Sequence, residues 1–571
     1  MRKLQRTLVK VPTVLWIVIL YAVASFIVIF PLMKSKVFFY GDDIVFQLNR
    51  IDNLVGYIKN GSILPILSSF AFKDQGIITN MVYPYQSLYL FAIIKHMVGD
   101  SILSIYLGMW ILTLLTLLSS HFSMQVLTKS LKTAIIFAFT YTFCMYRMMT
   151  MISRFDLGEL LAMCALPVFI VGLTEVLFDK YCYWPLIPFG ATFIFSSHIL
   201  TSVLLGLFTL VFFIVYCFAK DIKFKNTRNK YLIISLLSTV VLNCYQISLV
   251  CWGLLQKLQL PSIPALIDTD LDFFDILKNS ISNNIDRSST SGIGIVLIIM
   301  ILLVLFNLNK IEFKYRVLFL TSLAFVIVST SFVPWSLIQH TPLKIVQYSF
   351  RFLMIASCGI SMVGAIVVAK YLNSKMVVSY LFFIVMLNLS IVLSFIHYNS
   401  VNSVTSNAPV VVEGTRILTD STNYNRIVHG EWYLDYLPRQ SDVVSTEIKS
   451  KKVITSTDNY KVSYLPISNG IQYTIKNKSG NHEQFDLPFV LYKHLNYEVR
   501  VDNSVAKTER SKRSTLLVNI PNGTHKVKVH LKIPIFIIFM YSINFFSYFI
   551  VLGSIIWFIR RLIKNMTVHR S

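Results

Sequence analysis

The chain has 571 residues, of which 55% are hydrophobic and only 14% are charged, and its mean hydropathy is +0.63. Soluble domains carry roughly 25% charged residues, so this composition excludes an ordinary soluble protein and indicates a membrane protein. The formal net charge of +24 would suggest nucleic-acid binding in a soluble protein, but the basic residues cluster between apolar runs, where positive-inside loops need them, and we expect no nucleic-acid partner.

The first apolar run, residues 11–31, follows four basic residues: Arg2, Lys3, Arg6 and Lys10. It is longer than the apolar core of a signal peptide and has no obvious small-residue cleavage site. We therefore expect an uncleaved first membrane span.

Further apolar runs predict about twelve spans, because about 20 apolar residues are needed to cross a hydrocarbon layer about 30 Å thick. The predicted spans are residues 11–32, 102–127, 132–150, 158–178, 182–200, 202–219, 230–257, 292–309, 316–333, 350–371, 376–397 and 535–559. An even number places both termini on one side. If that side is inside, every inner loop is basic, as the positive-inside rule requires. The basic residues concerned are Lys129, Lys132, Lys180, Lys223, Lys225, Arg228, Lys230, Lys310, Lys314, Arg316, Lys370, Lys375, Arg560, Arg561 and Lys564.

Residues 86–98, "QSLYLFAIIKHMV", are apolar but too short to span the bilayer. Counting them as a span would place Lys129 and Lys132 outside and invert every later loop. We therefore expect an interfacial or re-entrant helix on the outer face.

Just after the first span, residues 38–61 read "FFYGDDIVFQLNRIDNLVGYIKNG". Apolar residues recur every three or four positions from Ile44, which predicts an amphipathic helix on the outer membrane surface. Asp42 or Asp43 suits its N-cap and Gly61 suits its C-terminal stop. Three polar residues share the adjacent face of this helix: Asp43, Gln47 and Arg50. On the structural interpretation, one aspartate only caps an anchoring helix. On the functional one, the pair places carboxylates at the membrane surface.

Other polar residues are predicted on the same outer side, and ionisable groups at membrane depth usually face a cavity or a partner. They lie in "SRFDLGELLAMCALP", "FSSHILTS" and "PWSLIQHTPLKIVQYSFRFL", and are Arg154, Asp156, Glu159, His198, Gln347 and Arg351. Each also has a local interpretation. Glu159 suits a helix N-terminus, Arg351 suits a snorkelling anchor, and His198 suits an ordinary buried histidine. A shared site depends on their convergence.

Residues 399–534 differ in composition, since short alternating segments such as "NYKVSYLPI", "IQYTIKN" and "THKVKVHLK" are separated by turn signals. We expect three parts: a transmembrane domain over 1–398, a β-rich extracytoplasmic domain over 399–534, and a last span with a basic cytoplasmic tail over 535–571. The seven cysteines include no CxxC pair and indicate no disulfide or metal site.

The stretches "GDDIVFQLNRIDNLVGYIKNG", "RFDLGELLAMCALP", "SSHILTS" and "QYSFRFL" follow one another as in bacterial GT-C-like multi-pass membrane proteins. The chain resembles the group labelled "6-pyruvoyl-tetrahydropterin synthase-related" membrane proteins, and its C-terminal part resembles larger proteins implicated in lipoteichoic acid glycosylation. Two positions depart from this pattern: Gln47 stands where His is frequent, and Ser349 stands where Pro is common. The histidines do not show the zinc-binding spacing that the pterin label would imply.

The resemblance implies a membrane glycosyltransferase in the plasma membrane of a bacterium. It would move a sugar from a polyprenyl-phosphate donor to a cell-envelope glycan or teichoic-acid-type acceptor outside. Asp42 or Asp43 would be the catalytic base, and Arg351 and Arg154, with Arg50 and His198, would bind the phosphate. Gln47, Glu159 and Gln347 would support them. The cofactor stays open: nothing specifies a metal, although a divalent ion bridging carboxylate and phosphate would fit.

Two other classes remain open. A non-catalytic envelope-assembly scaffold would tolerate substitution of both Asp42 and Asp43. A flippase or transporter of a lipid-linked glycan would use the same charges only for binding, but the chain shows no inverted repeat and no matching pair of Gly/Pro-broken spans. We therefore place transferase first, scaffold second and transporter third.

Overall fold

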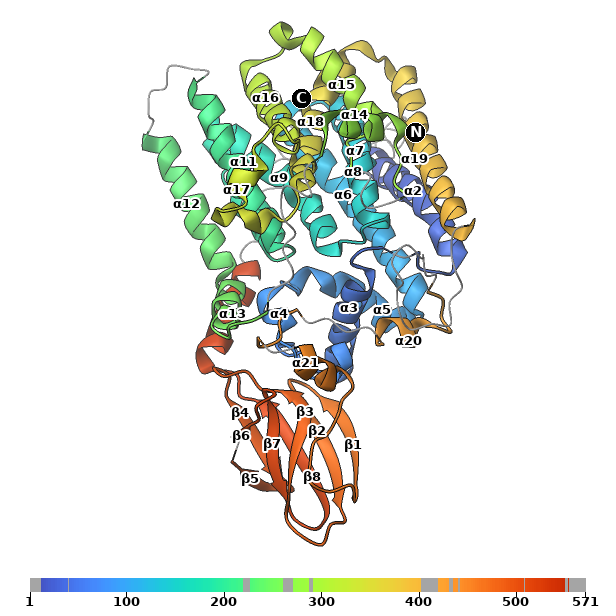
Figure 1. Cartoon of the computed structure of the whole chain (residues 1–571). Coiled ribbons are helices and arrows are strands. Elements are labelled where there is room, and N and C mark those ends of the chain that lie inside the picture. The colour runs from blue at the N-terminus through green and yellow to red at the C-terminus, as the bar shows by residue number, and fades with distance from the viewer. Residues whose placement is uncertain are drawn as a thin grey trace, which may run out of the picture. The chain divides into compact units, whose positions relative to one another are not determined.

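The computed structural model describes residues 12–39, 41–218, 226–259, 271–286, 291–401, 419–430, 435–439, 442–507, 509–549 and 553. Within these ranges the chain is mostly helical, and its named strands all lie between residues 460 and 531 (Figure 1). A helical multi-pass membrane protein with a β-rich C-terminal domain is thus confirmed. Several residues behind the predicted topology lie outside the described residues: Arg2, Lys3, Arg6, Lys10, Lys223, Lys225, Arg560, Arg561 and Lys564.

The chain divides into two compact units. The first, called here the helical unit, comprises Met1–Ile51, Gln86–Tyr231 and Ser262–Glu431. The second, called the mixed unit, comprises Asp52–Tyr85, Leu232–Pro261 and Trp432–Ser571 and contains all the strands. The predicted domain borders at 398 and 534 stay a prediction.

Six helices of the described residues are long and apolar enough to cross a membrane. They are α2 (Pro12–Ser35), α6 (Ser101–Thr128), α9 (Leu157–Leu177), α11 (Ile199–Phe218), α18 (Phe352–Tyr371) and α19 (Ser374–Val401). Two bent pairs raise this number to eight if each pair is one span: α7 (Leu131–Thr142) with α8 (Met145–Ile152), and α12 (Asn226–Leu242) with α13 (Cys244–Leu254). Shorter apolar helices are α10 (Leu186–Phe195), α15 (Ile295–Phe306), α16 (Phe313–Val328) and a helix over Ile535–Phe549. The predicted count of twelve spans is not confirmed.

The predicted spans over 132–150 and 230–257 correspond to bent helix pairs, because the chain bends by 43° between α7 and α8 and by 65° between α12 and α13. No Pro or Gly marks the first break. There the buried guanidinium of Arg147 donates to the carbonyl oxygen of Thr142 at 3.0 Å, and its Nη2 reaches the hydroxyls of Thr113 and Thr116 on α6. The side chain therefore satisfies a carbonyl that the interrupted helix leaves unpaired.

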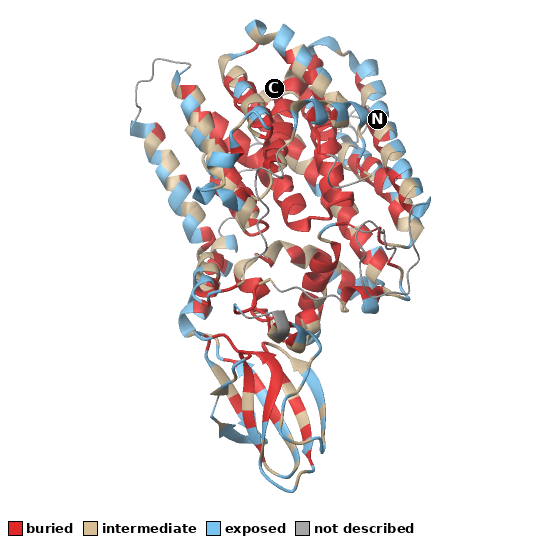
Figure 2. Cartoon of the chain, viewed as in Figure 1, coloured by how far each residue is buried: buried red, intermediate tan, exposed pale blue. Residues whose placement is uncertain are grey.

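The centre of the helical unit is formed by α9 and α18, which are almost entirely buried (Figure 2). α9 packs on α6 and α10, and α18 packs on α7, α15 and α16. At the end of α9, the fully buried carboxylate of Glu175 lies 2.8 Å from Nζ of Lys180 and 2.9 Å from Nζ of Lys314. This carboxylate joins α9 to the start of α16.

Helix α3 (Ile44–Lys59) forms where the apolar periodicity predicts it, and Gly61, with φ +63°, follows its end. The location of α3 at the membrane surface stays a prediction, but two residues of its polar face are buried rather than exposed to water. Gln47 and Arg50 are at most 1% exposed, and Nη1 of Arg50 donates to Oε1 of Gln47 at 3.1 Å. The periodicity identified an apolar face, but protein rather than water covers the other face.

Residues 86–98 form a 3-10 turn (Gln86–Leu88) and the short helix α5 (Tyr89–Val98), so the predicted short helix is confirmed. Its location at the membrane surface stays a prediction. Nζ of Lys95 on this helix bonds to the hydroxyl of Tyr424 at 2.7 Å. Other short helices are α4 (Thr79–Val82), α14 (Phe273–Ser282), α17 (Trp335–Ile338), α20 (Tyr424–Val428) and α21 (Asp442–Lys449).

The strands of the mixed unit form two antiparallel sheets. One has the order β1-β2-β8-β4-β5 and the other the order β3-β7-β6. The strands are β1 (Tyr460–Ile467), β2 (Gly470–Asn477), β3 (Glu483–Val490), β4 (Tyr497–Val501), β5 (Ser504–Ala506), β6 (Glu509–Arg510), β7 (Thr515–Ile520) and β8 (Gly523–Leu531). Aromatic contacts join the sheets face to face, with ring centroids 5.6 Å apart for Tyr460 and Phe485.

Residues 57–67 are anchored inside the mixed unit by a side chain from the β1–β2 turn. Oδ1 of Asn469 accepts hydrogen bonds from the backbone N–H groups of Ile66 and Leu67, both at 3.0 Å, and from the hydroxyl of Tyr57 at 2.8 Å. One turn amide thus organises residues 57–67.

Candidate functional site

The charged residues of "SRFDLGEL" lie in the loop between α8 and α9 and in the first turn of α9, within the helical unit. Nη1 of Arg154 lies 3.0 Å from Oε2 of Glu159, and its Nη2 lies 3.3 Å from Oδ2 of Asp156. Asp156 also caps α9, because its Oδ1 accepts the backbone N–H of Glu159 at 3.0 Å. All three side chains are buried. Their predicted convergence is therefore found.

The turn that presents these side chains holds a residue in an unfavourable backbone conformation. Phe155 has a φ of +55°, in the left-handed region that a bulky residue rarely adopts. Such conformations concentrate where the surroundings over-determine them, often at functional sites.

Two aromatic residues complete this cluster, and the sequence analysis did not single them out. The hydroxyl of Tyr146 on α8 donates to Oε1 of Glu159 at 2.5 Å. The guanidinium of Arg154 lies 4.8 Å from the ring centroid of Phe350, within the range of a cation–π contact. Both are single aromatic residues in apolar stretches, where no local pattern separates them from ordinary core residues.

Arg351 enters the cluster from the start of α18. Its Nη1 donates to the carbonyl of Val346 at 2.9 Å and to Oε1 of Gln347 at 2.7 Å. Its Nε lies 3.9 Å from Oε2 of Glu159 and has no hydrogen-bond acceptor among the described residues. Gln347 has a φ of +66°, a second strained residue at the site. The Arg351 guanidinium is thus held through Nη1, and its Nε remains available as a donor.

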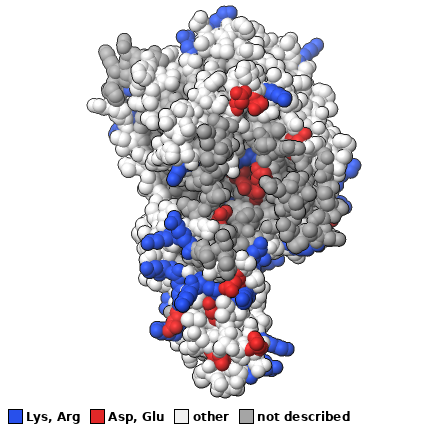
Figure 3. Space-filling model, in the orientation of Figure 1, with Lys and Arg blue, Asp and Glu red and all other residues white. Residues whose placement is uncertain are grey.

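Asp43 is joined to this cluster through its backbone, because its N–H donates to the carbonyl of Arg154 at 3.0 Å. Gly41 allows the approach: a Cβ there would lie 2.9 Å from the carbonyl oxygen of Ser153. The Asp43 side chain is partly exposed, whereas Asp42 is fully at the surface. In the space-filling view, acidic atoms with basic atoms beside them reach the surface near the middle of the helical unit (Figure 3).

The two adjacent aspartates therefore differ in environment. Removal of water from around the Asp43 carboxylate, together with the negative charge of Asp156, raises its pKa to about 7, although Arg154 and Arg351 act in the opposite direction. Among the described residues, no hydrogen bond or ion pair engages the Asp43 carboxylate. A carboxylate with this pKa exchanges a proton near neutral pH.

The same surroundings lower the pKa of Asp156. Burial raises the pKa of Asp156, but His198, Arg154 and Arg351 more than offset burial and hold the pKa below its usual value. The ring of His198 is buried, and its Nδ1 lies 2.8 Å from the hydroxyl of Thr201. Asp156 therefore stays ionised, whereas Asp43 titrates near neutrality. This difference suits Asp156 to a structural role and Asp43 to accepting a proton.

Arg50 and Gln47 form a pair along α3. Arg154 and Arg351 are the cations that act most strongly on the Asp43 carboxylate. A role of Arg50 in phosphate binding, and a supporting role of Gln47, stay predictions.

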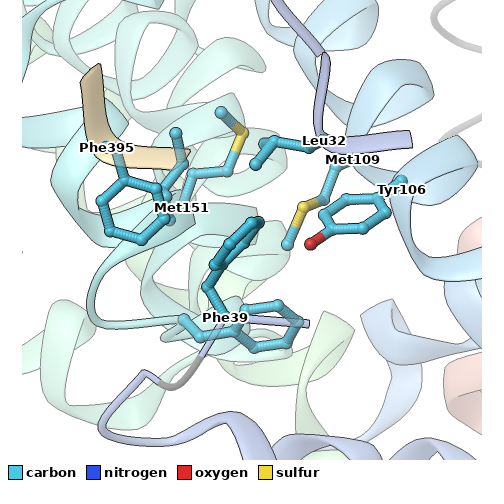
Figure 4. A pocket seen from close by; sticks show the side chains of 8 residues that line it. Leu32, Phe39, Tyr106, Met109, Met151 and Phe395 are labelled. Carbon is cyan, nitrogen blue, oxygen red and sulfur yellow. The ribbon is translucent and has the colours of Figure 1, made fainter. Parts of the chain in front are cut away.

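An apolar pocket lies next to the strained turn, because Phe155 lines it (Figure 4). Its accessible volume is about 10 Å³, room for about one water molecule. In the close-up, Phe39, Tyr106, Met109 and Met151 converge on one space. The pocket is lined by Leu32, Phe39, Tyr106, Met109, Met151, Ile152, Phe155 and Phe395. Phe39 precedes the Asp42–Asp43 pair in the chain, so the pocket and the charged cluster share two chain segments.

The described residues contain no group of three or more His, Cys, Asp or Glu side chains placed to hold a metal ion. In the cluster itself, Asp156 and Glu159 already engage guanidinium groups. A bridging divalent ion therefore stays an untested expectation.

Comparisons with known proteins place the chain near membrane glycosyltransferase structures. It is similar to ArnT from Cupriavidus metallidurans in the apo state, with 10% identity, a TM-score of 0.40, and coverage of 63% of this chain and 60% of ArnT. For ArnT from the same organism bound to undecaprenyl phosphate, the identity is 8% and the TM-score is 0.41, with coverage of 64% of this chain and 62% of ArnT. For the arabinofuranosyltransferase AftD from Mycobacteria, the identity is 12% and the TM-score is 0.41, with coverage of 66% of this chain and 26% of AftD.

The chain matches less than two thirds of the length of each neighbour, and the TM-scores are low. The activity therefore has to be argued from the site. No family model and no curated protein matches the chain, and the narrower pterin-related group name is not confirmed.

Proposed function

We propose that this chain is a membrane glycosyltransferase that moves a sugar from a polyprenyl-phosphate donor to a hydroxyl group of a cell-envelope acceptor. The observation that carries the proposal is the partly exposed Asp43 carboxylate, with a pKa of about 7, beside Arg154 and Arg351. A general base works best when its pKa lies near the operating pH. Asp43, rather than Asp42, is assigned this role, because Asp42 lies fully at the surface.

The proposed reaction balances with the side chains at hand. The acceptor oxygen attacks the anomeric carbon and its proton passes to the Asp43 carboxylate. The bond between the anomeric carbon and the phosphate oxygen breaks, and its electron pair stays on the polyprenyl phosphate. Negative charge then grows on the leaving phosphate, which the guanidinium of Arg351, with its free Nε donor, is placed to stabilise.

The apolar pocket supports a lipid-linked donor. Its walls are aliphatic and aromatic, and Phe155 links it to the turn that holds Arg154 and Asp156. The first isoprene units would pack against these apolar side chains once they move apart, while the phosphate meets the guanidinium groups. The proposal places the site at the outer leaflet of a bacterial plasma membrane, with both termini inside and the β-rich domain outside.

A scaffold or a flippase would need charges for binding but no carboxylate that titrates near pH 7. The experiment that separates these classes is an in vitro transfer assay with the purified full-length protein in nanodiscs, a panel of polyprenyl-phosphate sugars, and acceptor glycans. The readout is release of polyprenyl phosphate.

Asp43→Asn should lower this release about 10² to 10⁴-fold, the usual contribution of a general base, while donor binding persists. Asp42→Asn, one residue away, is the matched control and should retain most of the activity. A fully active Asp43→Asn protein would refute the assignment and favour the scaffold.

A further inference from the structure

The five-stranded sheet of the mixed unit has one buried and one open face. Side chains alternate along each strand, and on β2 and β8 the inward residues are buried: Ile471, Tyr473, Ile475, Val527, Val529 and Leu531. The residues between them point to the opposite face and are exposed or partly exposed. This second face is called here the open face.

The open face is basic. Lys461 on β1, Lys476 on β2, and Lys526 and Lys528 on β8 are all exposed on it, with Arg500 on β4. The three adjacent strands β1, β2 and β8 contain no Asp or Glu. Among the described residues, none of the four lysine ammonium groups forms an ion pair. The four lysines therefore have no anion supplied by their own strands.

The register of the sheet makes this arrangement unfavourable for the fold alone. Lys461 lies directly opposite Lys476, and Arg500 lies directly opposite Lys528. Like charges in opposed cross-strand positions destabilise a sheet. Arg500 is relieved in part by Glu498, at 2.5 Å, and Lys526 lies near the carboxylate of Asp502, but no acid forms an ion pair with Lys461, Lys476 or Lys528 among the described residues. Two like-charged pairs on one face are better explained by an external anion than by stability.

We propose that the open face binds an extended polyanion, a chain molecule that carries phosphate or carboxylate groups at regular intervals. Alternate residues on a strand are about 6.6 Å apart and neighbouring strands are about 4.8 Å apart, so the lysines form a flat grid of cations. A grid matches repeated charges along a chain, whereas a single ion would need donors that converge on one point.

The residues between the lysines favour a polymer over a lipid surface. Membrane-binding faces carry large apolar side chains that insert between headgroups. The central positions of the open face are instead polar: Ser463, Gln472, Thr474 and Thr524. Its apolar residues, Leu465, Ile467 and Val505, lie on the two edge strands β1 and β5. The polar positions can donate hydrogen bonds to the polymer between its charged groups.

This inference stands apart from the proposed transfer reaction, since binding can be measured without turnover. The test uses the purified full-length protein in neutral-lipid nanodiscs and fluorescently labelled long-chain inorganic polyphosphate, followed by fluorescence anisotropy over a range of salt. The test variant is Lys476→Gln/Lys526→Gln/Lys528→Gln. The control variant, Lys449→Gln/Lys493→Gln/Lys512→Gln, removes the same charge from exposed lysines of the same unit.

The test variant should bind polyphosphate about tenfold more weakly and with a shallower salt dependence, whereas the control should bind like the parent. The thermal midpoint of the test variant should equal or exceed that of the parent protein, because the cross-strand repulsion is relieved. Equal losses in both variants would mean that only net charge matters, and would overturn the proposal. The proposal would also be overturned if the test variant bound polyphosphate as the parent does but no longer captured vesicles of anionic phospholipid. The open face would then be a lipid-binding surface.

Discussion

Nη1 of Arg154 lies 3.0 Å from Oε2 of Glu159, and the two side chains are only 5% and 1% exposed. The same carboxylate accepts the hydroxyl of Tyr146 and lies 3.9 Å from Nε of Arg351. One buried carboxylate therefore positions both guanidinium groups that act on Asp43. This makes Glu159 a positioning residue, whose loss is felt first in stability.

Replacing Glu159 by Gln keeps the shape but leaves Arg154 in a buried site without its closest anion. Breaking a buried pair by removing one partner costs about 3–5 kcal/mol, so we expect a clear drop in the thermal midpoint of the protein in detergent. Tyr146→Phe removes one hydrogen bond from the same carboxylate and should cost only about 1 kcal/mol. If the two variants unfold at the same temperature, the pair does not hold the site together.

The pH dependence of transfer should report the carboxylate of Asp43. A base must be ionised to accept a proton, and its pKa is about 7, so kcat/KM should rise with pH and level off above neutrality. Because the charge of Asp156 raises this pKa, Asp156→Asn should move the midpoint to lower pH while keeping the cap of α9. A midpoint near 4 in the parent protein would exclude Asp43 as the base.

The same shift predicts how stability changes with pH. The pKa of Asp43 is raised above its ordinary value of 3.8, so the folded protein holds this proton more tightly than the unfolded chain. That contribution is complete below pH 3.8 and is lost as pH rises to about 7. Asp43→Asn should therefore stabilise the protein more at pH 8 than at pH 5, as thermal unfolding at the two pH values will show. A gain that does not depend on pH would contradict the shift.

Arg351 should decide the affinity for the lipid phosphate. Hydrogen bonds to charged groups contribute about 1.5–3 kcal/mol, so Arg351→Gln should weaken binding of polyprenyl phosphate by about ten- to hundredfold. Arg351→Lys should recover part of this affinity, because it keeps the charge but not the planar fork. Arg316→Gln on α16 is the control for loss of an arginine elsewhere. Unchanged affinity in Arg351→Gln would move the phosphate away from this guanidinium.

The sequence singled out residues that the structure brings into one charged cluster, but it did not reveal their surroundings. The spacing from Ile44 identified α3, and motif order placed Arg154, Glu159 and Arg351 at span ends. The periodicity did not reveal that Gln47 and Arg50 are buried. An apolar stripe shows which face seeks the core, but not what covers the remaining face, since that depends on distant segments.

Other features had no local signal. The break between α7 and α8 follows from the buried Arg147 and its bond to Thr142 rather than from Pro or Gly. Strand β3 was missed because its last six residues, from Phe485 to Val490, are all buried. Such a strand does not alternate, and Pro488 within it lowers its strand propensity.

Helix α9 carries a buried carboxylate near each end, Glu159 beside the site and Glu175 at the far end. The two are sixteen positions apart, about 24 Å along a helix, and each is tied by cations of other segments. Sliding or rotation of α9 would break ion pairs at both ends at once. On the proposed function, a lipid substrate and its product must nevertheless enter and leave the site. The movement that admits them therefore belongs to the elements around α9, such as the strained turn at Gln347, while α9 itself stays still.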